Sequence, residues 1–181
     1  MGDPAIRGRS VSPQAERTHT LSILVDNEAG VLARVIGLFS GRGYNIESLT
    51  VAEVDSQERL SRITIVTTGT EMVIEQIKNQ LARLVPVHDV HDLTIEGESV
   101  EHELALIRVE GTREMRVEAL RLASFLHARL VDSTTQAFVF EMTGSSEEID
   151  AFVELMRPLG LDEVSRTGVV ALSRRRPPAT A

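Results

Sequence analysis

The polar residues with the clearest potential for ligand chemistry lie in a short turn, Asn27-Glu28-Ala29-Gly30, which has a second asparagine, Asn45, farther along the chain. The side-chain amide of Asn27 has both hydrogen-bond donors and an acceptor. Gly30 has no Cβ atom, so a ligand can approach the backbone closely there. The free N–H groups at the start of a following helix favour a carboxylate. Together, the turn and Asn45 are suited to bind the charged groups of a free amino acid.

A structural interpretation of the same turn stays open. Asn27 would then cap the helix, and Gly30 would only relieve crowding at the turn. Residue spacing alone favours this structural interpretation over a ligand site.

Other arrangements in the sequence offer less chemistry. His88 and His91, with Asp89 and Asp92 beside them, are the best candidates for a metal site. However, strand positions three apart point to opposite faces of a sheet, so we expect the two imidazoles to diverge and the segment to be a solvated edge strand. The sequence contains no phosphate-binding loop, nucleophile elbow or HExxH motif. It therefore predicts no catalytic residues and no metal site.

Composition excludes several further classes. The chain of 181 residues has a net charge of −8, five Phe, one Tyr, no Trp and no Cys. A negative charge and few aromatic side chains argue against a nucleic-acid partner, and the absence of cysteine excludes disulfides and thiolate chemistry. No apolar run approaches the ~20 residues of a membrane helix. We expect a cytoplasmic protein with a disordered extension over residues 1–17, and we interpret the basic run Arg174–Arg176 as part of a solvated tail.

The elements that must position the turn follow a recognisable order. Hydrophobic periodicity predicts two helices, one from Val31 to a stop at Gly41-Arg42-Gly43 and one over Glu71–Leu84. Strands are expected over Thr20–Asp26, Asn45–Val54, Leu60–Thr68 and Val87–Ile95. The order strand, helix, strand, strand, helix, strand is the ferredoxin-like βαββαβ arrangement.

The second half of the chain repeats this order. Strands are expected over Glu103–Glu110, Leu130–Ser133, Ala137–Thr143 and Leu161–Ser173. One helix is expected over Arg113–Arg129 with Thr112 as N-cap, and a second after a capping box of Ser145 and Glu148. The fold class is therefore α+β, with two tandem ferredoxin-like domains. The predicted boundaries are an extension at 1–17, a first domain at 18–96, a linker at 97–101, a second domain at 102–173 and a flexible tail at 174–181.

The residues around the turn resemble one known family. Asn27–Phe39 (NEAGVLARVIGLF) and Arg42–Leu49 (RGYNIESL) are similar to the N-terminal ACT domain of acetolactate synthase small subunits. The similarity continues through Leu60–Ile65, and Arg166–Arg174 resembles the closing segment of the same family. The first run is highly specific, because other ACT domains share the glycine turn but not the long string after it.

This resemblance implies a non-catalytic regulatory subunit of acetolactate synthase in branched-chain amino-acid biosynthesis. Members of the family activate a separate, thiamine-diphosphate-dependent large catalytic subunit and confer feedback inhibition, usually by valine. Thiamine diphosphate, Mg and FAD would belong to that catalytic partner, and no cofactor is implied for this chain. The resemblance also implies a homodimer or higher homo-oligomer, with no nucleic acid and no membrane as partners.

The same resemblance implies a site shared between two protomers. In the family, ACT domains pair side by side and valine binds at their interface. One side of the pocket would be lined by Asn27, Ala29, Gly30, Val31 and Leu32. The partner protomer would contribute Asn45 and Ile46.

Two other functions are compatible with the residues. One is a stand-alone amino-acid-binding protein with repeated ACT domains that regulates a different target. The other is a small metabolic enzyme, which the absence of converging acid–base groups disfavours. A large thiamine-dependent partner that co-purifies with the chain would distinguish the leading function from the first alternative.

Overall fold

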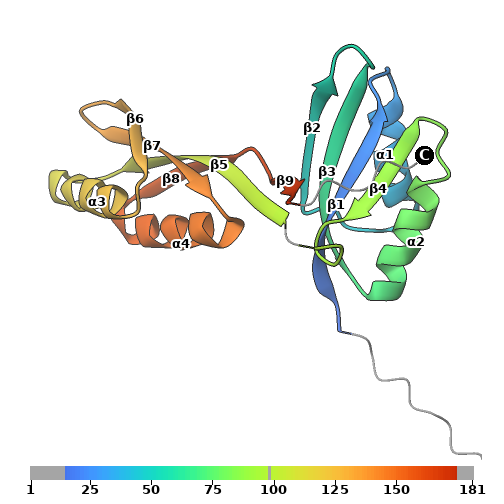
Figure 1. The fold of residues 1–181 in the computed structure, drawn as a ribbon. Helices are drawn as coiled ribbons and strands as arrows, with labels where there is room; N and C mark the ends of the chain where they lie inside the picture. Colours follow the sequence, from blue (N-terminus) through green and yellow to red (C-terminus); the bar gives the residue numbers. More distant parts are fainter. Residues whose placement is uncertain (1–14, 98, 175–181) are drawn as a thin grey trace, which may run out of the picture.

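The first half of the chain folds into a four-stranded antiparallel sheet with two helices on one face (Figure 1). A computed structural model describes residues 15–97 and 99–174. The elements of this first unit are β1 (Arg17–Asp26), α1 (Val31–Arg42), β2 (Ser48–Asp55), β3 (Leu60–Gly69), α2 (Glu71–Leu81) and β4 (Val87–Asp92). The strand order is β2-β3-β1-β4, which makes β2 and β4 the edges. The predicted βαββαβ fold is confirmed.

The second half repeats the arrangement in a second sheet with its own two helices (Figure 1). Its elements are β5 (Ser99–Glu110), α3 (Arg113–Phe125), β6 (Arg129–Ser133), β7 (Ala137–Gly144), α4 (Ser146–Met156), the short 3-10 helix η1 (Arg157–Leu159), β8 (Leu161–Arg166) and β9 (Val170–Ser173). The strand order is β6-β7-β5-β8, and β9 pairs with the first residues of β5.

Each unit has a separate apolar core between its sheet and its helices. In the first unit, Ile23 and Ile65 on the sheet pack in one buried cluster with Val35, Phe39 and Ile77 of the helices. In the second unit, Phe140 and Phe152 make an edge-to-face contact with ring centroids 6.2 Å apart. The period-2 and period-3.6 apolar patterns are sufficient to specify both cores, because each pattern places one face of its element inward.

The predicted helix caps form as expected. The Thr112 hydroxyl accepts a hydrogen bond from the Met115 N–H, and Ser145 and Glu148 form both halves of a capping box. Gly43 ends α1 in the left-handed conformation with φ 72°.

Several predicted boundaries are wrong. The second strand begins at Ser48 rather than Asn45, and residues 99–101 of the expected linker belong to β5. The expected final strand is broken into β8 and β9 by Gly168, which has φ 85°. The helix expected to reach Arg129 ends at Phe125, because His127 adopts φ 60° and turns the chain. The last two departures depend on left-handed residues, which interrupt a strand or helix whatever the apolar pattern is.

The two units are joined by a narrow two-stranded ribbon (Figure 1). The start of β5, over Ser99–His102, pairs with β9, over Val170–Ser173. This ribbon lies against the first sheet through a small buried cluster of Val66, Leu93, Val169 and Ala171. The remainder of β5 pairs with β7 and β8 inside the second sheet, so one strand belongs to both parts of the molecule.

A buried polar pair joins β1 to the end of β4. His19 is 2 % exposed and Asp92 is 0 % exposed, and His19 Nδ1 lies 2.7 Å from Asp92 Oδ2. The Thr94 N–H donates to the other oxygen of Asp92. Replacing Asp92 would therefore leave a buried imidazole without its partner.

We expect Asp92→Ala to lower the free energy of unfolding by about 3 kcal/mol, because removing one member of a buried polar pair leaves the other desolvated and unpaired. Urea denaturation followed by circular dichroism measures this. The matched control is Asp132→Ala, which removes an exposed carboxylate from β6 and should change stability by less than about 0.5 kcal/mol. Equal stabilities of the two variants would show that the His19–Asp92 pair has no structural role.

Candidate functional site

The turn after β1 is shaped by backbone hydrogen bonds. The Asn27 N–H donates to the Arg59 carbonyl at 2.7 Å, and the Glu28 N–H donates to the Asp26 carbonyl at 3.0 Å. Gly30 is the N-cap of α1, with φ 88°, and no side chain caps the helix. The structural interpretation of Asn27 as the helix cap is therefore wrong, and the exposed Asn27 side chain has no capping role.

The start of α1 is open and favours an anion. The first helical hydrogen bond of the i to i−4 type runs from the Arg34 N–H to the Gly30 carbonyl at 3.1 Å. The N–H groups of Leu32 and Ala33 precede that bond and have no acceptor within the helix. A Cβ atom built on Gly30 would meet nothing within 4 Å. A small carboxylate therefore has both space and donors at this position.

The remaining residues predicted in this part of the site differ in exposure. Ala29 is exposed, and Leu32 is 37 % exposed. Val31 is 4 % exposed and packs in the core, so it can offer a ligand its backbone but not its side chain.

The second predicted group lies beyond the other end of α1. Asn45 is exposed, and its carbonyl accepts a hydrogen bond from the Thr67 hydroxyl at 2.6 Å. Ile46 is partly buried against the first core. The Glu47 N–H donates to the Val66 carbonyl at 2.9 Å, which holds this segment to β3.

A single chain does not bring these two groups together. Asp26, beside the turn, pairs with Leu60 at one end of the sheet, whereas Thr67, which holds Asn45, pairs with His19 near the other end. The separation along β1 is about seven residues, or roughly 23 Å at ~3.3 Å per residue. Within one protomer, Asn27 and Asn45 therefore lie far apart.

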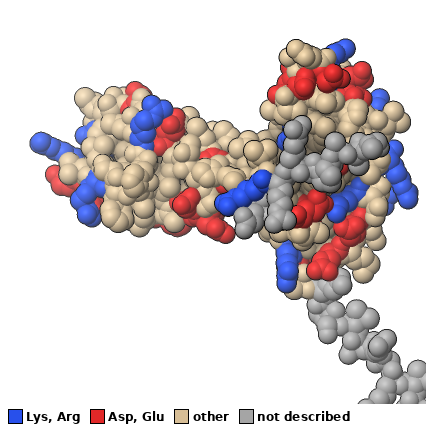
Figure 2. All heavy atoms as spheres, in the orientation of Figure 1, with Lys and Arg blue, Asp and Glu red and all other residues tan. Residues whose placement is uncertain are grey.

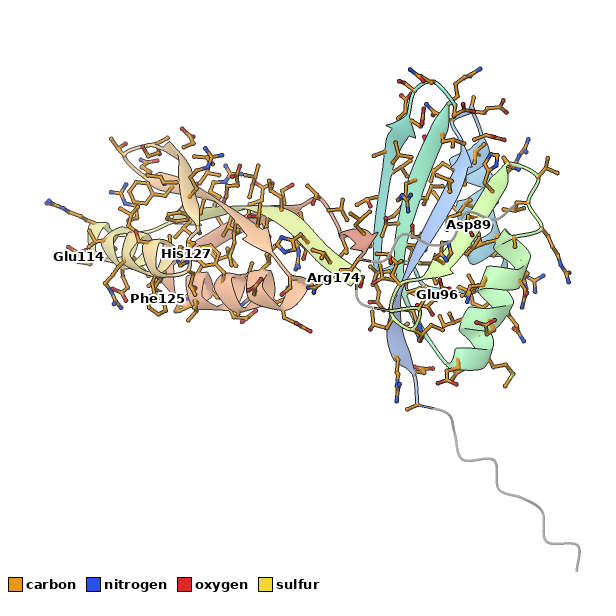
Figure 3. The ribbon with its side chains drawn as sticks, viewed as in Figure 1. Asp89, Glu96, Glu114, Phe125, His127 and Arg174 are labelled. Atoms are coloured by element: carbon orange, nitrogen blue, oxygen red, sulfur yellow. The ribbon has the colours of Figure 1, made fainter. Side chains whose placement is uncertain are left out.

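The histidines of β4 form hydrogen bonds to separate carboxylates. His88 Nε2 lies 2.7 Å from Asp26 Oδ1, whereas His91 lies between Asp89, at 2.6 Å, and Glu96, at 2.5 Å. Asp89 and Glu96 lie on the first unit, at β4 and the turn after it (Figure 3). Across residues 15–97 and 99–174, no group of three or more His, Asp or Glu side chains is arranged to hold a metal ion.

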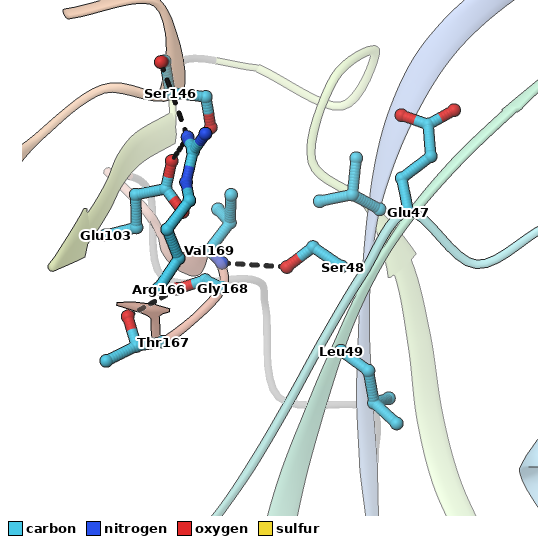
Figure 4. Close-up of a pocket in the computed structure, with 10 residues that line it drawn as sticks. Glu47, Ser48, Leu49, Glu103, Ser146, Arg166, Thr167, Gly168 and Val169 are labelled. Atoms are coloured by element: carbon cyan, nitrogen blue, oxygen red, sulfur yellow. Dashed lines mark hydrogen bonds and ion pairs between the residues drawn. The ribbon is translucent and has the colours of Figure 1, made fainter. Parts of the chain in front are cut away.

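Sequence reasoning missed a cavity of about 520 Å³ at the junction of the two units (Figure 4). Glu47 and Ser48 line it from the first unit, and Arg166 and Glu103 line it from the second. The Arg166 guanidinium donates to Glu103 and to Asp150, and the hydrogen bond to Glu103 raises the pKa of Arg166. No sequence motif marks this cavity, because its walls come from segments far apart in the chain.

The surface charge is mixed. Acidic side chains gather at the end of the first unit where β2 meets β3, and basic side chains elsewhere are interspersed with acidic ones (Figure 2). Exposed residues in that acidic region include Glu53, Asp55 and Glu58. None of the described helices is both long and apolar enough to cross a membrane.

Comparison with known proteins gives the family. Residues 21–89 match the model of the AHAS small subunit-like ACT domain, and residues 102–175 match the model of the small subunit of acetolactate synthase. The chain is 46 % identical over 156 residues to a probable acetolactate synthase small subunit of Archaeoglobus fulgidus, covering 86 % of this chain and 96 % of that protein. The chain belongs to the acetolactate synthase small-subunit family. The resemblance in the sequence is thereby confirmed.

Two further members of the acetolactate synthase small-subunit family are similar to this chain over most of its length. The acetolactate synthase isozyme 3 small subunit of Escherichia coli is 45 % identical over 155 residues, which cover 85 % of this chain and 94 % of that protein. The crystal structure of the acetolactate synthase small subunit from Thermotoga maritima has a TM-score of 0.78 and 36 % identity, and it covers 88 % of this chain and 99 % of that one. The two-unit fold is therefore shared with a solved member of the family.

The His91 cluster makes stability depend on pH. Burial lowers the pKa of His91, but its hydrogen bonds and charge interactions with Glu96 and Asp89 outweigh burial and raise the pKa above its ordinary value of 6.5. A raised pKa in the folded state means that the stabilisation is complete below the unfolded pKa and is lost as pH rises through the folded one.

We therefore expect His91→Gln to destabilise the protein more at pH about 5.5 than at pH about 8.5, as measured by urea denaturation. The control is His102→Gln, at an exposed histidine of β5, which should show a smaller difference between the two pH values. A destabilisation by His91→Gln that is independent of pH would contradict a stabilising interaction of protonated His91 with the carboxylates of Glu96 and Asp89.

Proposed function

We propose that this chain is the regulatory subunit of an acetolactate synthase, which activates a thiamine-diphosphate-dependent catalytic subunit and binds a branched-chain amino acid, valine first, for feedback inhibition. The observation that carries the proposal is the open, uncapped start of α1 at Gly30. It offers backbone donors to a carboxylate in a chain of the acetolactate synthase small-subunit family. No cofactor is proposed for this chain.

The separation of the two halves of the site supports a pocket shared between protomers. α1 carries the chain from β1 across β3 to the edge strand β2, so it lies on the β2 side of the sheet. If two β2 edges pair in antiparallel directions about a two-fold axis, the start of α1 in one protomer comes beside Gly43–Ile46 of the other. Asn27 and Gly30 would then face Asn45 and Ile46 of the second copy.

The surface of β2 is consistent with this pairing. Val51 and Val54 are 45 % and 49 % exposed on this edge strand. Unpaired edge strands offer rows of free N–H and C=O groups, so a second copy of the same edge is a suitable partner. A homodimer of this kind creates two identical pockets.

Binding and activity of the purified chain test the proposal. We expect isothermal titration calorimetry to detect valine at millimolar concentration. The chain should also raise the activity of its acetolactate synthase catalytic subunit, and valine should lower the activity of the complex. No binding of valine, leucine or isoleucine would contradict amino-acid sensing. Binding without a large thiamine-dependent partner would instead favour a stand-alone ACT-repeat regulator.

A charge at Gly30 should disrupt the pocket. We expect Gly30→Asp to abolish valine inhibition while activation of the catalytic subunit is largely kept, because the new carboxylate repels the carboxylate of the ligand. The space is open, and Asp tolerates a left-handed conformation better than most residues do.

The matched control is Gly30→Asn, which has nearly the same shape and the same tolerance of φ 88° but no charge. Valine titrations of both complexes should show that the Asn variant keeps more inhibition than the Asp variant. Equal valine sensitivity in the Asp variant and the wild-type protein would place the amino acid elsewhere.

A further inference from the structure

The short segment between β8 and β9, Thr167-Gly168-Val169, crosses from the second unit to the first, and we call it the strap. It adjoins the ribbon that joins the units and lines the junction cavity (Figure 4). Its central residue, Gly168, has φ 85°. Family membership and the apolar pattern assign no role to these three residues.

The strap is held on β2 by both polar backbone groups of Val169. The Val169 N–H donates to the Ser48 hydroxyl at 2.8 Å, and the Thr50 hydroxyl donates to the Val169 carbonyl at 2.9 Å. A Cβ atom on Gly168 would lie only 2.6 Å from Ser48 Oγ. The left-handed φ of 85° and this close approach together favour glycine at this position.

The other end of the strap is held by the second unit. The Thr167 N–H donates to the Leu104 carbonyl at 3.0 Å, and the Leu104 N–H donates to the Thr167 hydroxyl at 3.1 Å. Next to it, Arg166 bonds to Glu103 of β5 and to Asp150 of α4. The strap is therefore hydrogen-bonded to the second unit at one end and to β2 at the other.

On the first unit, the strap is attached next to one half of the candidate amino-acid site. β2 begins at Ser48, directly after the segment Asn45–Glu47. Ser48 and Val66 are directly opposite each other in the sheet, and the Glu47 N–H is bonded to the Val66 carbonyl. A shift of Asn45 and Ile46 on binding would therefore be passed to Ser48 over a very short stretch of backbone.

The packing around the strap leaves room for such a shift. The junction cavity of about 520 Å³ lies beside it, and the apolar cluster between the ribbon and the first sheet has only Val66, Leu93, Val169 and Ala171 as its buried members among the described residues. Where few apolar side chains pack between two units, directional hydrogen bonds have a larger share in setting the position of one unit relative to the other.

We propose that the strap couples amino-acid binding at the ACT interface to the position of the second unit, through the hydrogen bonds of Val169 with Ser48 and Thr50. This inference rests on the proposed function, because it takes the Asn45–Ile46 segment as part of the amino-acid site. Allosteric coupling is typically about 5- to 150-fold. The loss of both strap bonds should lower the coupling by roughly tenfold.

The test uses the full complex of this chain with its catalytic subunit. In the double variant Ser48→Ala with Thr50→Val, we expect valine binding, measured by calorimetry, to stay within about twofold of wild type. Activation of the catalytic subunit should be retained, whereas inhibition at saturating valine should weaken strongly. Gly168→Ala, whose methyl group would crowd Ser48, should likewise keep valine binding and weaken inhibition. This variant replaces the double variant in the test if the double variant folds poorly.

The matched control is Thr18→Val with Thr68→Val, which removes an exposed pair of hydroxyl groups 3.0 Å apart on the same sheet. It should keep both binding and inhibition. Full inhibition in the double variant overturns the inference, and so does a loss of valine binding or of activation, because the strap would then serve the pocket or the assembly instead. If the wild-type chain itself binds no branched-chain amino acid, the proposed function fails, and that outcome is recognised before any variant is compared.

Discussion

The direction of α1 across the sheet is the constraint on which the arrangement of the site depends. β1 delivers the chain to the turn at Asn27–Gly30, and α1 then returns it along the sheet, a distance of roughly 18 Å for its 12 residues at ~1.5 Å per residue. The segment with Asn45 must therefore begin at the far end of the sheet. Because of this direction, a pocket that uses both asparagines needs a second protomer, so the proposed amino-acid binding would depend on assembly.

The sequence predicts those structural features that depend on residues close together in the chain. The period of the apolar residues predicted the two βαββαβ units, and local chemistry predicted the caps at Gly43, Thr112 and Ser145. These features depend on side chains within about one helical turn of each other, so a single sequence contains the necessary information.

The sequence does not predict the features that depend on contacts between segments far apart in the chain. The sequence predicts a linker over residues 97–101, but residues 99–101 belong to β5 because they pair with residues 171–173 of β9. The junction cavity is lined in part by Arg166 and Glu103, which come from neighbouring strands of the second sheet but lie 63 residues apart in the chain. The candidate amino-acid-binding residues come from the family resemblance, because the spacing of Asn27 and Gly30 alone favours a helix cap over a ligand site.

Gly168 also limits how freely the two halves of this protein can be exchanged. Each half has its own core and looks like an independent module. However, the absence of a side chain at Gly168 is matched to the hydroxyl of Ser48, more than a hundred positions earlier in the chain. In a chimera of the first half of this subunit with the second half of a relative, each core would fold normally. The two halves would fit together at the junction only if the chimera had serine at position 48 and glycine at position 168.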